Sequence, residues 1–199
     1  MLCVALTTIG AGRAQQPAPG VLGQKFAEVN FDVVDLSGLN KNGYSSGLGL
    51  NLPATPNLDV GLGYAYGWLN TTGTTLHEHT FTTAANWHAS APGIKPAFGF
   101  GLGYDWTRNK FGALHVNDGA AIWGAGVAVE IPVGAASLTP SITFTDVFRS
   151  RSVGALRYGV EANYWFTPAV AGYANVTFTD FTGHHGSSWM YRTGLRLKF

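Results

Sequence analysis

The sequence predicts an all-β fold, an antiparallel up-and-down transmembrane β-barrel of ten strands, on three observations. Segments of alternating apolar and polar residues recur along the chain, each close to the roughly 9–11 residues that cross a bilayer as a tilted strand. The composition is 46% apolar and 12% charged, and it includes 27 glycines, which weaken helices. The last segment alternates up to a terminal aromatic residue, Phe199. An eight-stranded barrel is one alternative, and a soluble barrel or sandwich with its aromatic face packed inside is another.

The first 23 residues are expected to precede the barrel. Residues 1–14 are typical of a secretory signal peptide, because an apolar run from Leu2 to Ile9 is followed by small residues at Gly12 and Ala14, the positions that a signal peptidase reads. The sole cysteine, Cys3, lies in this leader. Residues 15–23 are expected to form a spacer and residues 24–199 the barrel. A buried N-terminal strand is the alternative for the leader.

Ten segments alternate with a period of two, so that each has one apolar and one polar face. The apolar faces, which include Leu62, Phe100 and Leu195, are expected to point outward. The ninth segment is the weakest, because Tyr173 falls on its polar face. The expected strands run over residues 27–33, 47–52, 58–68, 80–88, 98–106, 123–131, 138–144, 157–166, 170–180 and 191–199.

The C-terminal strand resembles the assembly signal of bacterial outer-membrane β-barrel proteins. That signal has a polar residue, a glycine, an apolar residue and a terminal aromatic residue, places that Arg192, Gly194, Leu197 and Phe199 occupy here. The resemblance, to OmpA-like, OmpX-like and porin-like proteins of the Gram-negative envelope, covers residues 24–199 as a pattern. It implies a bacterial outer-membrane location, contact with membrane lipid and lipopolysaccharide, and insertion by the barrel assembly machinery.

The connections alternate in length, which orients the barrel. Short turns at residues 53–57, 91–96, 132–136 and 167–168 are expected on the periplasmic side, with both termini and the spacer. Outer loops are expected at residues 37–44, 70–75, 109–118, 149–154 and 183–188. Two aromatic girdles follow from this orientation, with Trp68 and Trp106 at the outer rim and Trp87, Phe166 and Phe199 at the inner rim.

The polar faces predict a narrow lumen lined by ion pairs. The charged residues expected there are Glu28, Asp32, Asp59, Asp105, Glu130, Arg157, Glu161, Arg192, Arg196 and Lys198. Because the first and last strands of a closed barrel pair antiparallel, alignment of their ends places Glu28 opposite Arg196 and Asp32 opposite Arg192. Ten strands enclose little more space than side chains can fill. The sequence therefore predicts an integral envelope protein with a structural or surface role and at most weak passive permeability, and a small-solute channel is the alternative.

The sequence offers little support for chemistry, and neither an enzyme, a cofactor nor a metal site is predicted. His77 and His79 share one strand face, while His115, His184 and His185 fall in expected loops without a cysteine or carboxylate that would fix a metal site. His185 and Ser187 resemble the His-x-Ser pair of outer-membrane lipid A deacylases, but the glutamate that follows in those enzymes is absent. A formal net charge of +1 gives no electrostatic basis for binding nucleic acid. The oligomeric state is not predicted.

Overall fold

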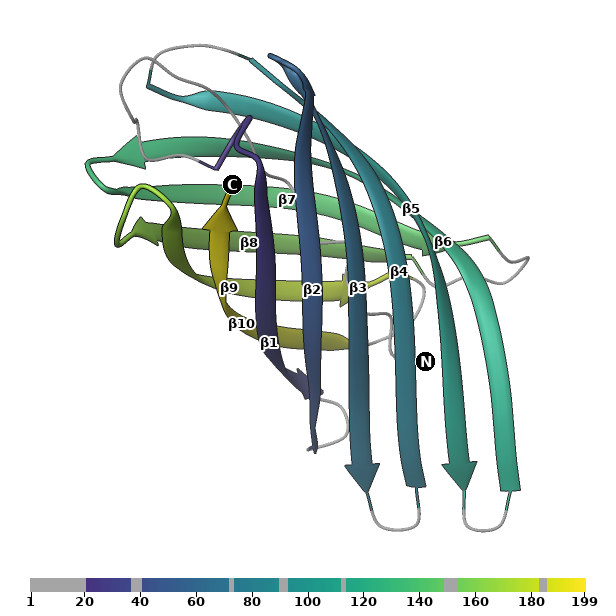
Figure 1. Ribbon diagram of the computed structural model, residues 1–199. Helices are drawn as coiled ribbons and strands as arrows, with labels where there is room; N and C mark the ends of the chain where they lie inside the picture. The colour runs from purple at the N-terminus through teal and green to yellow at the C-terminus, as the bar shows by residue number, and fades with distance from the viewer. Residues whose placement is uncertain are drawn as a thin grey trace.

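Ten antiparallel strands form a closed barrel in the computed structural model, which describes residues 21–36, 41–71, 74–89, 93–111, 114–148, 154–182 and 186–199 (Figure 1). Each strand pairs with its neighbours in sequence, and β1 pairs with β10 to close the sheet. The predicted ten-stranded up-and-down architecture is therefore confirmed. The strands are β1 (Phe26–Leu36), β2 (Lys41–Thr55), β3 (Leu58–Thr71), β4 (Thr74–His88), β5 (Lys95–Phe111), β6 (Leu114–Val133), β7 (Ala136–Val147), β8 (Ala155–Trp165), β9 (Val170–Phe181) and β10 (Ser187–Lys198).

Alternation along the strands places apolar side chains outside and polar side chains inside. Leu62, Phe100 and Leu195 are 48%, 43% and 49% exposed, so the predicted outward parity is confirmed. Tyr173, on the polar face of β9, is buried. No helix within the described ranges is long and apolar enough to cross a membrane.

Tight connections gather at the end of the barrel where the chain enters β1 and leaves β10. The predicted turns between β2 and β3, β4 and β5, β6 and β7, and β8 and β9 all lie there. Gly134, between β6 and β7, has a φ of 60°, which favours glycine because a side chain is strained in that region. We call this end the turn end and the opposite end the loop end.

The barrel wall is taller on one side. Strands β3 to β6 have 14, 15, 17 and 20 residues, whereas β7 to β10 have 11 or 12. The β3–β4 and β5–β6 hairpins project at the loop end (Figure 1). Outer loops at residues 70–75 and 109–118 were therefore the wrong expectation, because backbone pairing continues there to Thr71 and Thr74 and to Phe111 and Leu114. Where both faces of a strand contact water, the backbone hydrogen bonds continue but apolar and polar residues need not alternate. The alternation therefore underestimates the length of the strand.

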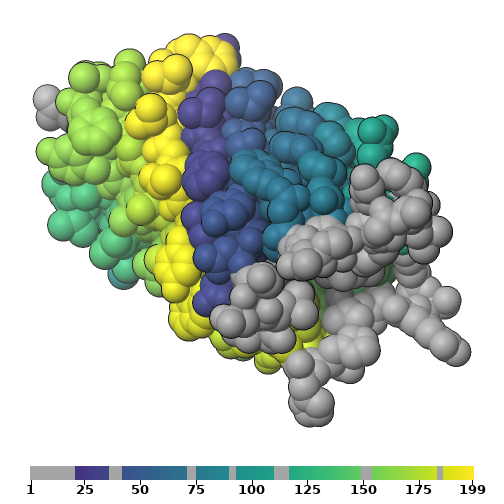
Figure 2. Space-filling model, turned by 90° about the horizontal axis from the view of Figure 1, so that it is seen from below, coloured from purple at the N-terminus to yellow at the C-terminus, as the bar shows by residue number. Residues whose placement is uncertain are grey.

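The chain closes on itself along the β1–β10 seam. Glu28 lies opposite Arg196 and Asp32 opposite Arg192, which is the register expected from the sequence. Figure 2 shows β10 side by side with β1, and β2 on the other side of β1. This seam brings the first and last strands together and holds two buried arginine–carboxylate pairs.

Candidate functional site

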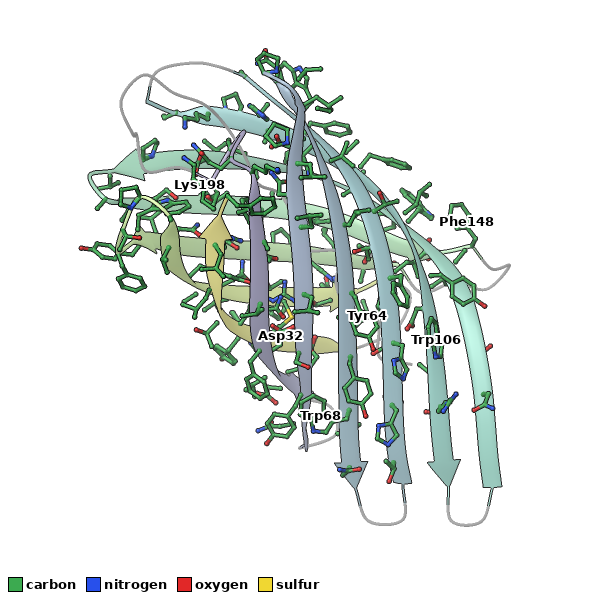
Figure 3. The ribbon with its side chains drawn as sticks, in the orientation of Figure 1. Asp32, Tyr64, Trp68, Trp106, Phe148 and Lys198 are labelled. Atoms are coloured by element: carbon green, nitrogen blue, oxygen red, sulfur yellow. The ribbon has the colours of Figure 1, made fainter. Side chains whose placement is uncertain are left out.

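The interior of the barrel is the candidate site, because the sheet directs its charged side chains there. Glu28, Asp32, Asp59, Asp105, Glu130, Arg157, Arg192 and Arg196 are all buried, and Glu161 is partly buried. Lys198 is the exception and corrects the sequence analysis: it is exposed at the end of β10, where the wall ends (Figure 3). Lys198 has the inward parity, but it is the last residue of β10, so the barrel wall does not extend far enough to bury its side chain.

Arg192 and Asp32 form the first strong pair of the seam. The Arg192 Nε donates to Asp32 Oδ1 at 2.6 Å, and Nη2 donates to Oδ2 at 2.7 Å. The Ser45 hydroxyl of β2 also donates to Asp32 Oδ2 at 2.7 Å. This two-pronged geometry matches the planar guanidinium to the carboxylate, the strongest common arrangement of such a pair.

Arg196 bridges two carboxylates from opposite sides. Its Nε donates to Glu28 Oε2 at 2.8 Å, its Nη1 to Glu161 Oε1 at 2.8 Å, and its Nη2 to Glu161 Oε2 at 3.1 Å. Nη1 also donates to the amide oxygen of Asn163. The Tyr173 ring lies 4.0 Å from the guanidinium carbon, so a cation–π contact completes the cage. The inward tyrosine of β9 thus has a clear structural partner.

Glycines on β2 make room for these side chains. Gly49 and Gly47 lie opposite Glu28 and Asn30. A Cβ at Gly49 would approach the Glu28 Cγ to 2.7 Å, and one at Gly47 would approach the Asn30 Oδ1 to 2.8 Å. The cavity that remains between this wall and Arg192 is about 30 Å³, enough for only a few waters. The long side chains therefore fill the space beside the seam.

A second charged cluster lies at the turn end, and we call Asp59, His88, Lys95 and Glu130 the mouth cluster. Lys95 Nζ is 3.6 Å from Glu130 Oε2, and His88 Nε2 is 3.6 Å from Asp59 Oδ2. The first pair was not expected from the sequence, because Lys95 was assigned to a turn. Lys95 and Glu130 are cross-strand partners, so extending the expected strand 98–106 by three residues toward the N-terminus identifies the pair.

Other inward residues complete the lining. Asp105 accepts a 3.3 Å hydrogen bond from the Thr80 hydroxyl, and Arg157 is buried on β8. Glu78 of β4 is fully buried, and it was not expected in the lumen because the expected strand started at Thr80. Its parity, shared with Thr80, is the signal that identifies it.

Aromatic side chains form an outward belt on the tall wall. Trp68 and Trp106 lie toward the loop end, far from Lys198 (Figure 3). The Tyr66 hydroxyl is 2.6 Å from His77 Nδ1, the Tyr64 hydroxyl is 2.9 Å from His79 Nδ1, and His79 stacks on Trp106. At the turn end, Trp87, Phe166 and Phe199 are exposed. The two histidines expected to share a face therefore have tyrosine and tryptophan neighbours.

The described residues hold no group of three or more His, Cys, Asp or Glu side chains arranged as metal ligands. His184 and His185 lie outside the described residues, as do residues 1–20, and the side chain of His115 is likewise not described. The signal peptide and most of the spacer thus stay predictions, and the resemblance of His185 and Ser187 to a deacylase pair also lies partly outside the described residues.

The barrel is similar to several solved outer-membrane proteins. An outer membrane channel from Pseudomonas putida F1 matches with a TM-score of 0.56 at 9% identity, over 94% of this chain and 100% of that one. Neisserial surface protein A matches at 0.52 and 15% identity, over 88% and 97%. The translocator domain of autotransporter NalP from Neisseria meningitidis matches at 0.52 and 14% identity, over 88% of each chain.

No protein-family model and no curated protein matches the sequence. The likeness to known proteins is therefore structural, and at these identities it concerns the fold alone. The chain has the closed antiparallel barrel fold that outer-membrane proteins have.

Proposed function

We propose that this chain is an integral protein of the bacterial outer membrane, with a structural or surface role and at most weak passive permeability. The observation that carries the proposal is the distribution of side chains, which is the reverse of that in a water-soluble protein. Large apolar residues around the whole circumference, such as Val29, Phe98 and Val160, are about half exposed, while arginines and carboxylates are buried. A surface of this kind suits hydrocarbon, and a closed barrel leaves no unpaired sheet edge within it.

The interior supports the second half of the proposal. Ion-paired side chains fill the lumen along the seam, in the room that the β2 glycines leave, and the cavity beside them is about 30 Å³, the space of a few waters. Open porins have larger barrels with an aqueous channel. A small-solute channel is the second candidate, favoured by the likeness to the outer membrane channel from Pseudomonas putida F1.

The aromatic belts orient the barrel in the proposed membrane. Tryptophan and tyrosine concentrate at membrane interfaces, so Trp68 and Trp106 lie at the outer leaflet and Trp87, Phe166 and Phe199 at the periplasmic one. The start of β1 and the end of β10 then face the periplasm, and the outer belt contacts lipid and lipopolysaccharide.

Fractionation and conductance test the proposal together. Envelope fractionation, followed by gel electrophoresis with and without heating, should show a heat-modifiable band in the outer-membrane fraction. Planar bilayers containing the purified protein should show no steady channel of porin size. A soluble periplasmic protein would contradict the location, and large stable conductance steps would favour the channel.

Deletion of Phe199 tests the proposed assembly signal formed by Arg192, Gly194, Leu197 and Phe199. Phe199 lies at the barrel rim, where its backbone N–H donates to the Lys25 carbonyl at 3.3 Å and the Lys25 ammonium lies 4.4 Å from its ring. Recognition by the assembly machinery predicts that the variant stays in the periplasm and is degraded, whereas Phe199→Tyr inserts. Normal amounts of heat-modifiable barrel after the deletion would refute the signal.

A further inference from the structure

The segment that precedes β1 enters the barrel. The backbone of residues 21–25 reaches β1 from inside the turn end, and Val21 and Leu22 are each only 2% exposed. Leu22 packs against Ala97, an inward residue of β5. A spacer was expected here, but the burial of two apolar side chains indicates a specific docking contact.

Hydrogen bonds from three strands hold this segment. The Val21 N–H donates to Glu130 Oε1 at 2.6 Å, and the Gly23 N–H donates to Asp59 Oδ2 at 3.3 Å. The Asn51 amide donates to the Gln24 carbonyl at 2.9 Å. Gly23 has a φ of 74°, a left-handed conformation that turns the chain from the mouth back toward the wall. The segment therefore docks against two carboxylate acceptors and one amide donor that the barrel strands hold in place.

The mouth cluster is built as a receptor for backbone amides. Its two carboxylates are buried, and the Lys95 ammonium and the His88 imidazole each stand 3.6 Å from one of them. A buried carboxylate without close donors is costly, and the N–H groups of the segment supply them. The segment and the two carboxylates thus stabilise each other at one place.

We propose that residues 21–25 are a plug that closes the turn end of the lumen, and that Glu130 and Asp59 are its receptor. Releasing the plug would open an acidic vestibule to water and small cations, with Ala97 on its wall. The proposal that this end faces the periplasm rests on the proposed function, but the plug itself depends only on the contacts within the barrel.

Cysteine labelling tests the plug. We suggest Ala97→Cys in a Cys3→Ser background, since the chain has no other cysteine. The protein, refolded in detergent micelles, is treated with a small methanethiosulfonate reagent. In the parent, Ala97→Cys should react slowly; in Glu130→Gln and in a variant lacking residues 15–23, it should react at least about tenfold faster, because the rate follows local opening.

Thr145→Cys provides the matched control, because Thr145 is as buried as Ala97 but lies on β7 toward the loop end. Its labelling rate should not change in either variant. Heat-modifiability of each variant verifies folding, and Leu22→Asn replaces the deletion if the shortened chain does not form a barrel. Equal Ala97→Cys rates with and without a docked segment would overturn the plug.

The readout separates this proposal from the proposed function. Labelling in micelles reports on the barrel alone, and fractionation reports on its location. If the protein is absent from the outer membrane but shows the rate increase, the plug is supported and the proposed function is contradicted. If it is in the outer membrane and the rates are unchanged, the proposed function is supported and the plug is contradicted.

Discussion

The seam and the mouth cluster both pair buried carboxylates with basic side chains in one lumen, but the two sets of contacts differ in length and in number. At the seam, each arginine holds its carboxylates through several contacts of 2.6–3.1 Å. At the mouth, a lysine and a histidine stand 3.6 Å from theirs. A guanidinium fork can saturate a carboxylate, whereas an ammonium or imidazole leaves acceptor capacity for another donor. The seam is therefore a closed structural joint, and the mouth can bind a further segment of chain.

Reversing the charge of Arg196 should have the largest effect on this comparison. Arg196→Glu removes the bonds to Glu28 and Glu161 and adds a third carboxylate between them. Breaking a buried pair by removing one partner costs about 3–5 kcal/mol. We expect loss of heat-modifiability at lower temperature and a lower urea midpoint in micelles. Adding Glu28→Arg should restore part of the loss, because only one of the two carboxylates is then compensated.

A double-mutant cycle gives the decisive reading for that pair. Glu28→Arg alone, Arg196→Glu alone and the double variant are compared under identical lipid or detergent conditions. If the two effects simply add, the seam pair is not energetically coupled, and closure depends on backbone pairing alone.

Filling the glycine wall should have an intermediate effect. Gly49→Val places a side chain where the Glu28 stem lies, so Glu28 must leave its position beside Arg196. Overpacking of this kind costs about 1–3 kcal/mol. Urea titration should show the loss, and Gly186→Val is the control, because a Cβ there meets only the Phe181 ring at 3.9 Å. Equal stability of the two variants would mean that the wall leaves more room than its contacts indicate.

Removing the lysine of the mouth cluster should have the smallest effect. Lys95→Met keeps the length of the side chain but loses its charge, and Glu130 still accepts the hydrogen bond from Val21. A hydrogen bond to a charged group contributes about 1.5–3 kcal/mol, and this contact is longer than such a bond, so we expect a loss below that range. The same urea titration measures it. A loss as large as that of Arg196→Glu would remove the distinction between the two clusters.

Much of the fold followed from the sequence because a barrel is a repetitive object. Parity fixes which face of each strand points inward, and closure fixes which residues of the first and last strands meet. That is why the pairing of Asp32 with Arg192 could be predicted. The height of the β5–β6 hairpin could not, because the alternation of apolar and polar residues ends before the backbone pairing does.

The contacts at the mouth cluster could not be predicted for a different reason. Val21 and Leu22 belong to no strand, so their burial depends on a tertiary contact with β5 and β6 that no local pattern encodes. His88 was correctly placed on the polar face of its strand, but its proximity to Asp59 reflects a diagonal across the β3–β4 pair. Contacts between directly paired strand residues could be predicted from the sequence. Contacts made by the segment that turns back into the barrel before β1 could not.

The seam also has a kinetic consequence. Its ion pairs join residues 160 and 168 positions apart, whereas every other strand pair joins neighbours in sequence. Contacts of high sequence separation form slowly, because the chain between them must first be ordered. Hairpins can therefore form early, and burial of the four seam charges belongs to the final step of barrel closure. Until then, Arg192 of β10 and the acids of β1 lack their partners across the seam, so a half-formed sheet retains a charged edge that resists pairing with the wrong strand.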